Sequence, residues 1–523
     1  MEKQLPKNWI EVQLIDILEV LENGSRPKGG VQNIFDGVPS LGGEHLDSNG
    51  GFKFGKLKYV PTSFAEKMNR GKIKENDILI VKDGATTGKT SFVDNNFPFD
   101  LAFVNEHVFI CRTFQNLNSK CVFYFLFGKS GFSRIMENFT GSAQGGINQK
   151  FASNTLIPLP PLTEQNRIVT KLDTLFNQLE TIKASIAKIP VLLKEFRQQV
   201  LTQAVTGKLT EEWRKGKELE SADILIQKII QKRIQDFDLK CKLAKEKGER
   251  KPTKVLLDKL PKIEIIDVDL PEKWFQTNVH FLSFVTKLAG FEYSLHFDLK
   301  EEGEIPVVRA QNVQMGKFED KNRLYMSKET SDILVRSQLH GREILMVFIG
   351  AGTGNVCLAP KDERWHLAPN VAKIDVDGIS TEYLYLYLQS ALGIKNVLSR
   401  VKATAQPSLS METIRDIVAL VPPLEEQYEI VSRVENLFAK ADAIEQQYQS
   451  LKEKIDNLPQ ALLHKAFKGE LTEQLESDGD ARELLKQIQE LKNSNVKPKK
   501  ATSTKVKKYP KNETVLGMVA EPE

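Results

Sequence analysis

Residues 160–176 read PPLTEQNRIVTKLDTLF, and residues 422–438 read PPLEEQYEIVSRVENLF, so one pattern returns 262 residues further along the chain. Aligned without gaps, 160–212 and 422–474 share seventeen of fifty-three residues. A fixed internal period predicts that a chain contains two copies of one structural unit. We therefore expect a pseudo-two-fold repeat, in which each copy has a variable segment followed by a better-matched one.

The better-matched segments carry apolar residues at alternating steps of four and three. This seam consists of Ile168, Leu172, Leu175, Leu179, Ile182 and Ile186 in the first copy, and of Ile430, Val434, Leu437, Ala441, Ile444, Tyr448 and Leu451 in the second. Such a pattern over several heptads predicts two long helices that pair as a coiled coil. Amphipathic helices on separate cores are the alternative, and Pro190 and Pro459 would kink either helix. The sequence leaves open whether the helices pair parallel or antiparallel.

A shorter helix is expected after each long one, over 221–234 and 480–491, with Ser221 and Asp480 as N-caps. Residues 240–262 have the composition of a solvated linker. Residues 492–511 contain eight lysines and no acid, which is typical of a disordered tail or of an arm that binds phosphates.

The variable segments mix short apolar runs with Gly, Asn and Asp turns. Strands are predicted within 38–46, 78–84, 107–113, 305–313 and 371–378, and helices near 119–137 and 381–399. This pattern predicts α+β domains.

The glycine-rich stretch GATTGKT (84–90) resembles a phosphate-binding loop, so a nucleotide-binding site has to be considered. A phosphate-binding loop needs four residues between its two glycines, and here only three separate Gly84 from Gly88. The second copy has Gly350 and Gly354 at the matching positions, but Asn355 in place of Lys89. We therefore interpret the four glycines as turn residues between two strands, where a positive φ is often required.

Composition narrows the class of protein. The 523 residues carry a net charge of +4, and no apolar run approaches the length of a membrane span. The N-terminus lacks the apolar core of a signal peptide, so a cytoplasmic protein is expected. The four cysteines and seven histidines show no metal-ligand spacing, and no catalytic motif is visible. We therefore predict a chain without a catalytic site, metal or cofactor of its own.

The tandem arrangement resembles the specificity subunit of type I restriction–modification systems. The resemblance rests on PLPPLTEQNRIV (158–169) with TGKLTEEW (206–213), and on VPPLEEQYEIV (421–431) with FKGELTEQ (467–474). It implies target recognition domains that each bind one half of a bipartite double-stranded DNA target, separated by an antiparallel helical spacer. It also implies two modification subunits that methylate adenine with S-adenosylmethionine, and restriction subunits that use ATP and Mg²⁺.

The implied boundaries are 1–157 for target recognition domain 1, 158–262 for the first helical spacer and linker, 263–419 for target recognition domain 2, 420–493 for the second spacer and 494–523 for the basic tail. A coiled-coil scaffold that binds no DNA is the alternative function.

Side chains that match base edges in hydrogen-bonding capacity are candidates for DNA contacts. They are Lys82, Thr86, Thr87, Lys89 and Gln144 in the first domain, and Arg309, Gln311, Asn312, Asn355, Arg400, Lys402 and Gln406 in the second. Gln144 and Gln406 occupy equivalent positions, which favours a shared structural role. Lys89 and Asn355 differ at one position, which favours sequence-specific contacts.

Overall fold

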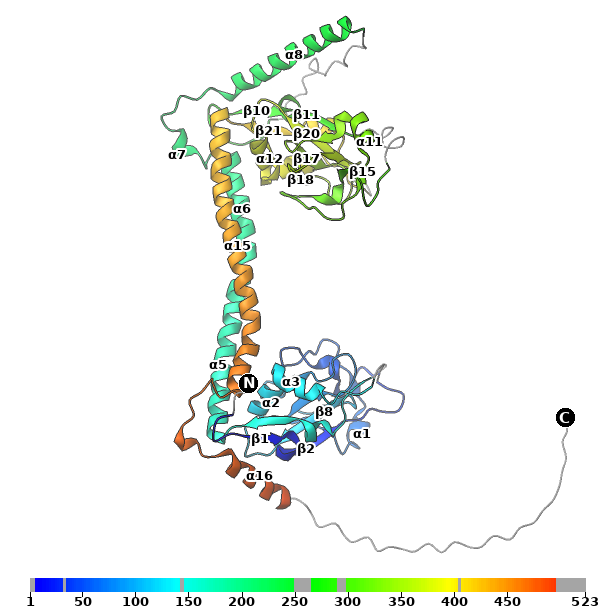
Figure 1. Ribbon diagram of the computed structural model, residues 1–523, viewed down its shortest axis with the longest axis vertical. Coiled ribbons are helices and arrows are strands. Elements are labelled where there is room, and N and C mark those ends of the chain that lie inside the picture. Colours follow the sequence, from blue (N-terminus) through cyan, green and yellow to red (C-terminus); the bar gives the residue numbers. More distant parts are fainter. Residues whose placement is uncertain are drawn as a thin grey trace, which may run out of the picture. The chain divides into compact units, whose positions relative to one another are not determined.

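The structure is a computed structural model that describes residues 5–31, 34–141, 145–248, 265–288, 298–402 and 406–494 (Figure 1). The chain forms two compact units. Unit 1 comprises Met1–Lys183 with Lys452–Glu523, and unit 2 comprises Ala184–Leu451. Each unit therefore combines one variable segment with spacer residues from both sequence repeats. The basic tail beyond residue 494 lies outside the described residues.

The variable part of unit 1 is built on three sheets. Its strands are β1 (Ile10–Gln13), β2 (Leu18–Asn23), β3 (Val38–Leu41), β4 (Tyr59–Val60), β5 (Ile78–Val81), β6 (Thr90–Phe92), β7 (Phe103–Val104), β8 (Val108–Thr113) and β9 (Leu156–Leu159). The strand orders are β2-β8-β5-β6, β4-β3-β7 and β1-β9, and only β3 and β7 pair in parallel.

Unit 2 repeats this topology. Its strands are β10 (Phe275–Asn278), β11 (Ser283–Lys287), β12 (Ile305–Val308), β13 (Val313–Gln314), β14 (Lys317–Phe318), β15 (Tyr325–Met326), β16 (Gln338–Leu339), β17 (Ile344–Val347), β18 (Val356–Leu358), β19 (Trp365–Leu367), β20 (Val371–Val376) and β21 (Val418–Val421). The order β11-β20-β17-β18 matches β2-β8-β5-β6, and β12 pairs in parallel with β19 as β3 does with β7. The sheets confirm the predicted α+β class and internal repeat.

The apolar run of β5 is explained by burial on both faces of its sheet. Successive side chains of a strand point to opposite faces. Ile78 and Ile80 belong to the main core of unit 1, which includes α2 (Ser119–Phe127), whereas Leu79 and Val81 pack with the buried residues of β7 and β8. The ILMV run of β17 alternates in the same way between two cores of unit 2.

Smaller helices complete the two units. Those of unit 1 are η1 (Leu14–Ile17), η2 (Gly43–His45), α1 (Thr62–Ala65), α3 (Lys129–Met136), α4 (Phe151–Asn154), η5 (Glu476–Asp478) and α16 (Ala481–Ser494). Those of unit 2 are α7 (Glu211–Arg214), α8 (Ala222–Glu246), α9 (Val279–Leu282), η3 (Ala310–Asn312), α11 (Lys328–Ile333), η4 (Val335–Ser337), α12 (Thr381–Gln389), α13 (Ala391–Leu398) and α14 (Met411–Arg415).

Several predicted helix boundaries were wrong. The helices expected near 119–137 and 381–399 are each divided, at Gly128 and Ser390, whose extended backbone ends one helix and starts the next. Helix α8 continues to Glu246, into the range assigned to the linker. Asp480 accepts a hydrogen bond from the Arg482 amide at 2.7 Å, whereas the Ser221 side chain makes no cap bond to α8.

The spacer consists of α5 (Leu162–Ile186), α6 (Ile189–Val205) and α15 (Leu424–Phe467). In unit 2, Arg197 pairs with Asp442 and Glu445, while Arg214, beyond the end of α6, pairs with Glu426 at the start of α15. The two helices therefore run antiparallel there. In unit 1 the start of α5 likewise lies beside the residues that follow α15.

The prolines act differently in the two spacer segments. Pro190 lies in the first turn of α6, after a break at Ala187 and Lys188, so the first copy has two helices where one was expected. Proline is tolerated there because the first-turn amides have no partner within the helix. Pro459 instead lies inside the continuous α15, at a position without a proline in the first copy.

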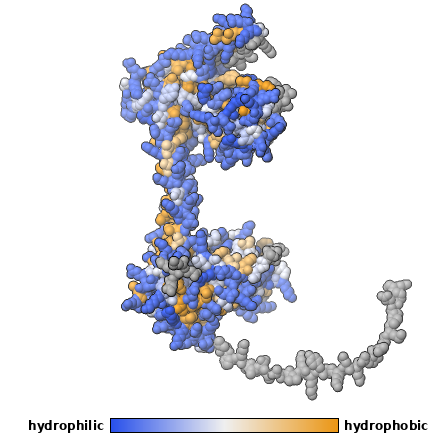
Figure 2. Space-filling model, in the orientation of Figure 1, coloured by the Kyte–Doolittle hydropathy of each residue, from blue (hydrophilic) through white to orange (hydrophobic). Residues whose placement is uncertain are grey.

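The predicted seam is buried most deeply where core residues of the variable segments also cover it. Ile168, Leu172, Leu179, Ile430 and Val434 are buried, and Leu175, Ile186, Leu437 and Tyr448 are half-buried. Ile182, Ile444 and Leu451 are 43%, 48% and 43% exposed. Figure 2 shows hydrophobic side chains on the visible face of the spacer helices.

The Glu-Gln pair of each repeated motif forms a buried joint. In unit 1, Glu164 is fully buried and accepts hydrogen bonds from Trp9 Nε1 at 2.8 Å, Gln474 Nε2 at 2.9 Å and Thr472 Oγ1 at 3.1 Å. Gln165 Nε2 donates to the Pro160 carbonyl at 2.8 Å. Glu164 thus joins the segments LPKNW (5–9) of the first repeat and GELT (469–472) of the second to the start of α5.

Unit 2 contains the equivalent joint. Glu426, also fully buried, accepts from Thr210 Oγ1 at 2.6 Å, from Trp274 Nε1 at 3.0 Å and from the Arg214 guanidinium. Gln427 Nε2 donates to the Pro422 carbonyl at 2.9 Å. The GKLT segment of the first repeat therefore completes the unit that holds the second variable segment, just as GELT completes the unit that holds the first.

An ion pair outside the joint holds η5 to α5 in unit 1. Arg167 donates two hydrogen bonds to the buried Asp478 carboxylate, at 2.5 and 2.6 Å, and the Leu475 amide donates a third at 2.8 Å. The Arg167 bonds are the main reason that the pKa of Asp478 falls from 3.8 to about 2. A carboxyl with a lowered pKa in the folded state stabilises the protein above its unfolded pKa, and this stabilisation disappears as pH falls through the folded pKa.

We expect Asp478→Asn to lower the free energy of unfolding by about 1–2 kcal/mol at pH 7, because one pKa unit corresponds to about 1.4 kcal/mol and the exposed side of Arg167 is screened by water. The difference from the unchanged chain should persist down to about pH 5 and shrink between pH 4 and pH 2. Denaturant unfolding at several pH values measures it. The matched control is Asp236→Asn on the exposed face of α8, and an equal, pH-independent loss in both variants would contradict the assignment.

Candidate nucleic-acid interface

The glycine-rich stretch is the turn of a β-hairpin in both units. β5 pairs antiparallel with β6, and β17 with β18. Gly84 and Gly88 have φ values of +92° and +82°, and Gly350 and Gly354 have +109° and +93°. These values confirm the interpretation as turn glycines, since other residues rarely adopt them.

The two residues that differ after this turn make equivalent bonds. Lys89 Nζ donates to the Leu46 carbonyl at 3.2 Å, and Asn355 Nδ2 donates to the Val313 carbonyl at 3.4 Å. Leu46 follows the 3-10 turn η2, and Val313 follows η3. Each side chain thus ties its hairpin to the adjacent 3-10 turn. A direct base contact by either residue stays a prediction.

Other candidates also make contacts within the turns. Thr87 Oγ1 donates to the Gly84 carbonyl at 2.7 Å, as Thr353 does to Gly350, so Thr87 closes the turn. Thr86, at the tip, is exposed.

The loops that follow α3 and α13 each lie beside the hairpin of their own unit. The Ile147 amide donates to the Lys82 carbonyl at 2.8 Å, and the Leu409 amide donates to Phe348 at 2.8 Å. In each domain the structure therefore places the described part of this loop against the hairpin strand. Gln144 lies outside the described residues, and Gln406 is exposed.

Three further candidates of unit 2, besides Asn355, have structural contacts. Asn312 is 3% exposed, and its amide group bonds to the backbone of Arg309, Glu319 and Lys321. Arg309 Nη2 donates to the Asn322 carbonyl. Arg400 Nη1 bonds to the Asn396 carbonyl and side chain at the end of α13. In contrast, Gln311 and Lys402 are exposed.

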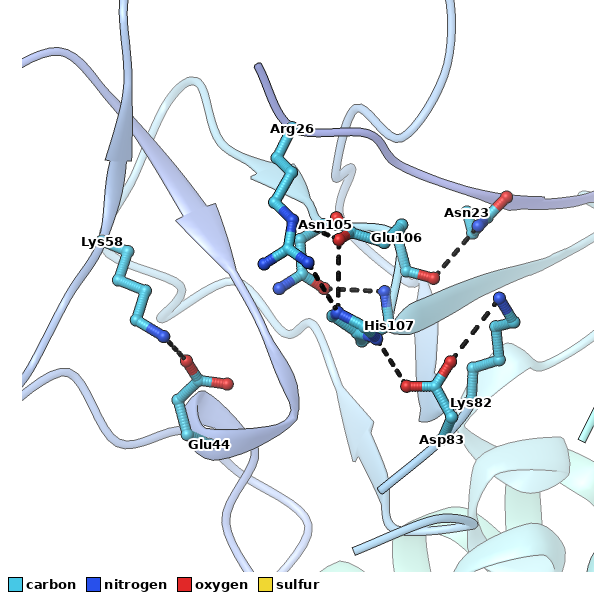
Figure 3. Close-up of polar contacts among 9 residues, drawn as sticks. All are labelled: Asn23, Arg26, Glu44, Lys58, Lys82, Asp83, Asn105, Glu106 and His107. Carbon is cyan, nitrogen blue, oxygen red and sulfur yellow. Dashed lines mark hydrogen bonds and ion pairs between the residues drawn. The ribbon is translucent and has the colours of Figure 1, made fainter. Parts of the chain in front are cut away.

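Four strand ends meet at one edge of the variable part of unit 1. β3 and β7 are parallel, and Asn23 of β2 and Val81 of β5 both lie beside the start of β8. The residues that follow these ends carry a group of polar side chains, shown in Figure 3. We define rim 1 as Arg26, Glu44, Lys82, Asp83, Asn105, Glu106 and His107.

Rim 1 is held together by a chain of charged contacts. His107 Nδ1 lies 2.5 Å from Asp83 Oδ1, its Nε2 lies 3.2 Å from Glu106 Oε1, and the same Glu106 oxygen pairs with Arg26. Lys82 Nζ lies 3.6 Å from the other Asp83 oxygen. His107 is still 39% exposed, so rim 1 offers both donors and acceptors to a ligand such as a base edge.

Unit 2 presents different chemistry on the same backbone. The amide of residue 82 bonds to the carbonyl of His107, and the amide of Phe348 bonds to the carbonyl of Asn370. Phe348, Ile349 and Asn370 therefore stand where rim 1 has Lys82, Asp83 and His107. A shared frame with different side chains suits two domains that bind different sequences.

Unit 1 also exposes a basic segment next to rim 1. All seven cations between residues 53 and 74 are exposed, and Glu66 is the one acid among them. They are Lys53, Lys56, Lys58, Lys67, Arg70, Lys72 and Lys74. Exposed cations of this density are suited to contacts with DNA phosphates.

Most of rim 1 was missed by the sequence prediction. The sequence signal that could have identified rim 1 is a polar or charged group directly after a buried strand. Such groups are Lys82-Asp83 and Asn105-Glu106-His107. Within the described residues, no group of three or more His, Cys, Asp or Glu side chains is placed to hold a metal ion. No helix in the same ranges is long and apolar enough to cross a membrane.

The fold and the two edges define a protein with two related binding domains on one helical spacer. Residues 6–191 and 283–453 match the family described as type I restriction modification DNA specificity domain. Because these ranges cover more than half of the sequence, the chain belongs to this family. Its members are DNA-recognition components and not catalytic subunits, as the sequence predicted.

Similar proteins extend over nearly the whole chain. The EcoKI specificity subunit of Escherichia coli K12 is 28% identical over 492 residues, which is 90% of this chain and 91% of that protein. The EcoBI specificity subunit of E. coli is 26% identical over 482 residues, 90% of each. The HsdS subunit from Thermoanaerobacter tengcongensis shares the fold, with a TM-score of 0.56 and 16% identity over 90% of this chain and 99% of that one.

Proposed function

We propose that this chain binds a bipartite double-stranded DNA target, with one half-site contacted by each recognition domain, and directs type I modification and restriction subunits to it. The main support is that family membership coincides with two edges of equal backbone geometry and different side chains. A scaffold that binds no DNA is not favoured, because the family is a DNA specificity family.

The partners follow from the same proposal. Two modification subunits would supply S-adenosylmethionine and the adenine methylation, and restriction subunits would supply the chemistry that needs ATP and Mg²⁺. We assign subunit docking to apolar spacer side chains that are more than 40% exposed, namely Ile182 in unit 1 and Ile444 and Leu451 in unit 2. The complex would act in the cytoplasm.

Methylation sequencing tests the proposal. Adenine methylation should appear at one interrupted motif when the chain is produced together with its modification subunit, and should disappear when the chain is omitted. The base readers should be exposed side chains such as Thr86, Gln311 and Lys402. Methylation that persists without the chain, or that marks a single uninterrupted motif, would contradict the proposed function.

A further inference from the structure

The 3-10 turns η2 and η3 each present one exposed side chain at the same point of the two recognition domains. These side chains are Glu44 and Gln311. We infer that both determine base specificity, with Glu44 accepting a hydrogen bond from cytosine N4 and Gln311 binding adenine N6 and N7. The inference rests on the proposed function and names the bases contacted by one position in each domain.

The last residue of each turn fixes the backbone of that turn. His45 is 1% exposed, and its Nδ1 accepts from the Gly42 amide at 2.8 Å. Its Nε2 lies 3.1 Å from the Lys56 carbonyl, to which it donates because Nδ1 is the acceptor. Asn312 does the same in η3, where its Oδ1 accepts from the Arg309 amide at 3.0 Å.

A side-chain hydrogen bond from the hairpin also holds each turn. The Lys89 and Asn355 bonds described above end on Leu46 and Val313, the residues that directly follow η2 and η3. Different residue types thus hold the two turns in one geometry. Such a frame orients its exposed side chain before any ligand binds, which lowers the entropic cost of binding.

The contacts of Glu44 explain which base it can bind. Its carboxylate pairs with Lys58, and a Cβ on Gly42 would lie 2.4 Å from Glu44 Oε2 and 2.7 Å from Asn105 Nδ2. Glu44 therefore lies over Gly42, beside the rest of rim 1. Burial raises the pKa of Glu44, but the hydrogen bond from Lys58, a backbone hydrogen bond and the positive charge of Lys58 together outweigh it, so the pKa lies below its ordinary value. The ionised carboxylate can only accept hydrogen bonds.

The lysines around Glu44 indicate which group of DNA its carboxylate can bind favourably. Lys53, Lys56 and Lys58 precede β4 and are exposed, so they attract phosphates. A carboxylate among them is repelled by phosphates and gains only from an amino group on a base edge, of which cytosine N4 is the usual partner. Gln311 has both a donor and an acceptor, which match adenine N6 and N7.

The experiment exchanges the two functional groups in the complete chain with its modification subunit. Glu44→Gln should change one position of the first half-site from cytosine to adenine, with a tenfold to hundredfold shift in preference. The second half-site should not change. Gln311→Glu should do the reverse in the second half-site. Methylation sequencing and competition binding with substituted duplexes provide the measurement.

The controls separate this inference from the proposed function. Glu19→Gln changes an exposed carboxylate at the other end of β2 and should leave both half-sites unchanged. If the unchanged chain directs methylation to an interrupted motif but both exchanges leave every base preference intact, the inference is wrong and the proposed function stands. Uniform loss of affinity for all sequences would also overturn it, because it would assign Glu44 and Gln311 to the scaffold.

Discussion

Glu426→Ala should lower the free energy of unfolding of unit 2 by roughly 3–5 kcal/mol, which is the usual cost of breaking a buried ion pair from one side. The carboxylate is fully buried, and the substitution leaves Arg214, Thr210 and Trp274 Nε1 without their shared acceptor. A domain is stable by only about 5–15 kcal/mol, so this loss should remove a large fraction of the stability of unit 2.

Denaturant unfolding and limited proteolysis of the complete chain measure this effect. Glu425→Ala is the matched control, because Glu425 is the exposed neighbour on the same helix turn and should change stability little. Trp274→Phe removes one donor to the carboxylate and should cost about 1 kcal/mol. If Glu426→Ala and Glu425→Ala unfolded alike, the buried joint would not be what holds the GKLT segment to the second recognition domain.

This joint illustrates what the sequence could and could not predict. The motif containing Glu426 was found because it recurs, and the heptad steps that follow it predicted the helix correctly. The partners of Glu426 could not be predicted, because Thr210 and Trp274 are more than 150 residues away and belong to another repeat and another domain. A recurring motif therefore identifies an important residue, but the partners of that residue become known only from the folded structure.

At the candidate interface, too, the sequence predicted local features but not tertiary contacts. Turn glycines were predicted well, since a positive φ is a local requirement of the chain. Asn312 and Lys89 were selected for their hydrogen-bonding groups, yet the structure uses those groups on nearby carbonyls. Glu106 and His107 escaped notice because their importance depends on four strand ends that meet in space. Residue type therefore identifies candidates, and exposure in the fold separates them.

A chain whose residues 279–417 are replaced by the matching segment of another family member should recognise a target with one new half-site and one unchanged half-site. The junctions follow from the antiparallel pair of β10 and β21, in which Asn278 faces Val418. Keeping both strands preserves Trp274 and its bond to Glu426. The donor should retain tyrosines equivalent to Tyr383 and Tyr387, whose hydroxyls donate to Leu420 and Val418 of β21.

Affinity for the original target should fall by about a thousandfold or more, toward the level of non-specific binding, because one recognition domain no longer fits its half-site. Methylation sequencing should show the unchanged half-site paired with a new one. Replacement of residues 14–155, between β1 and β9, is the reciprocal control and should change the other half-site. Because each recognition domain has its own hydrophobic core, a change in both half-sites after one replacement would mean that the domains do not bind their halves independently.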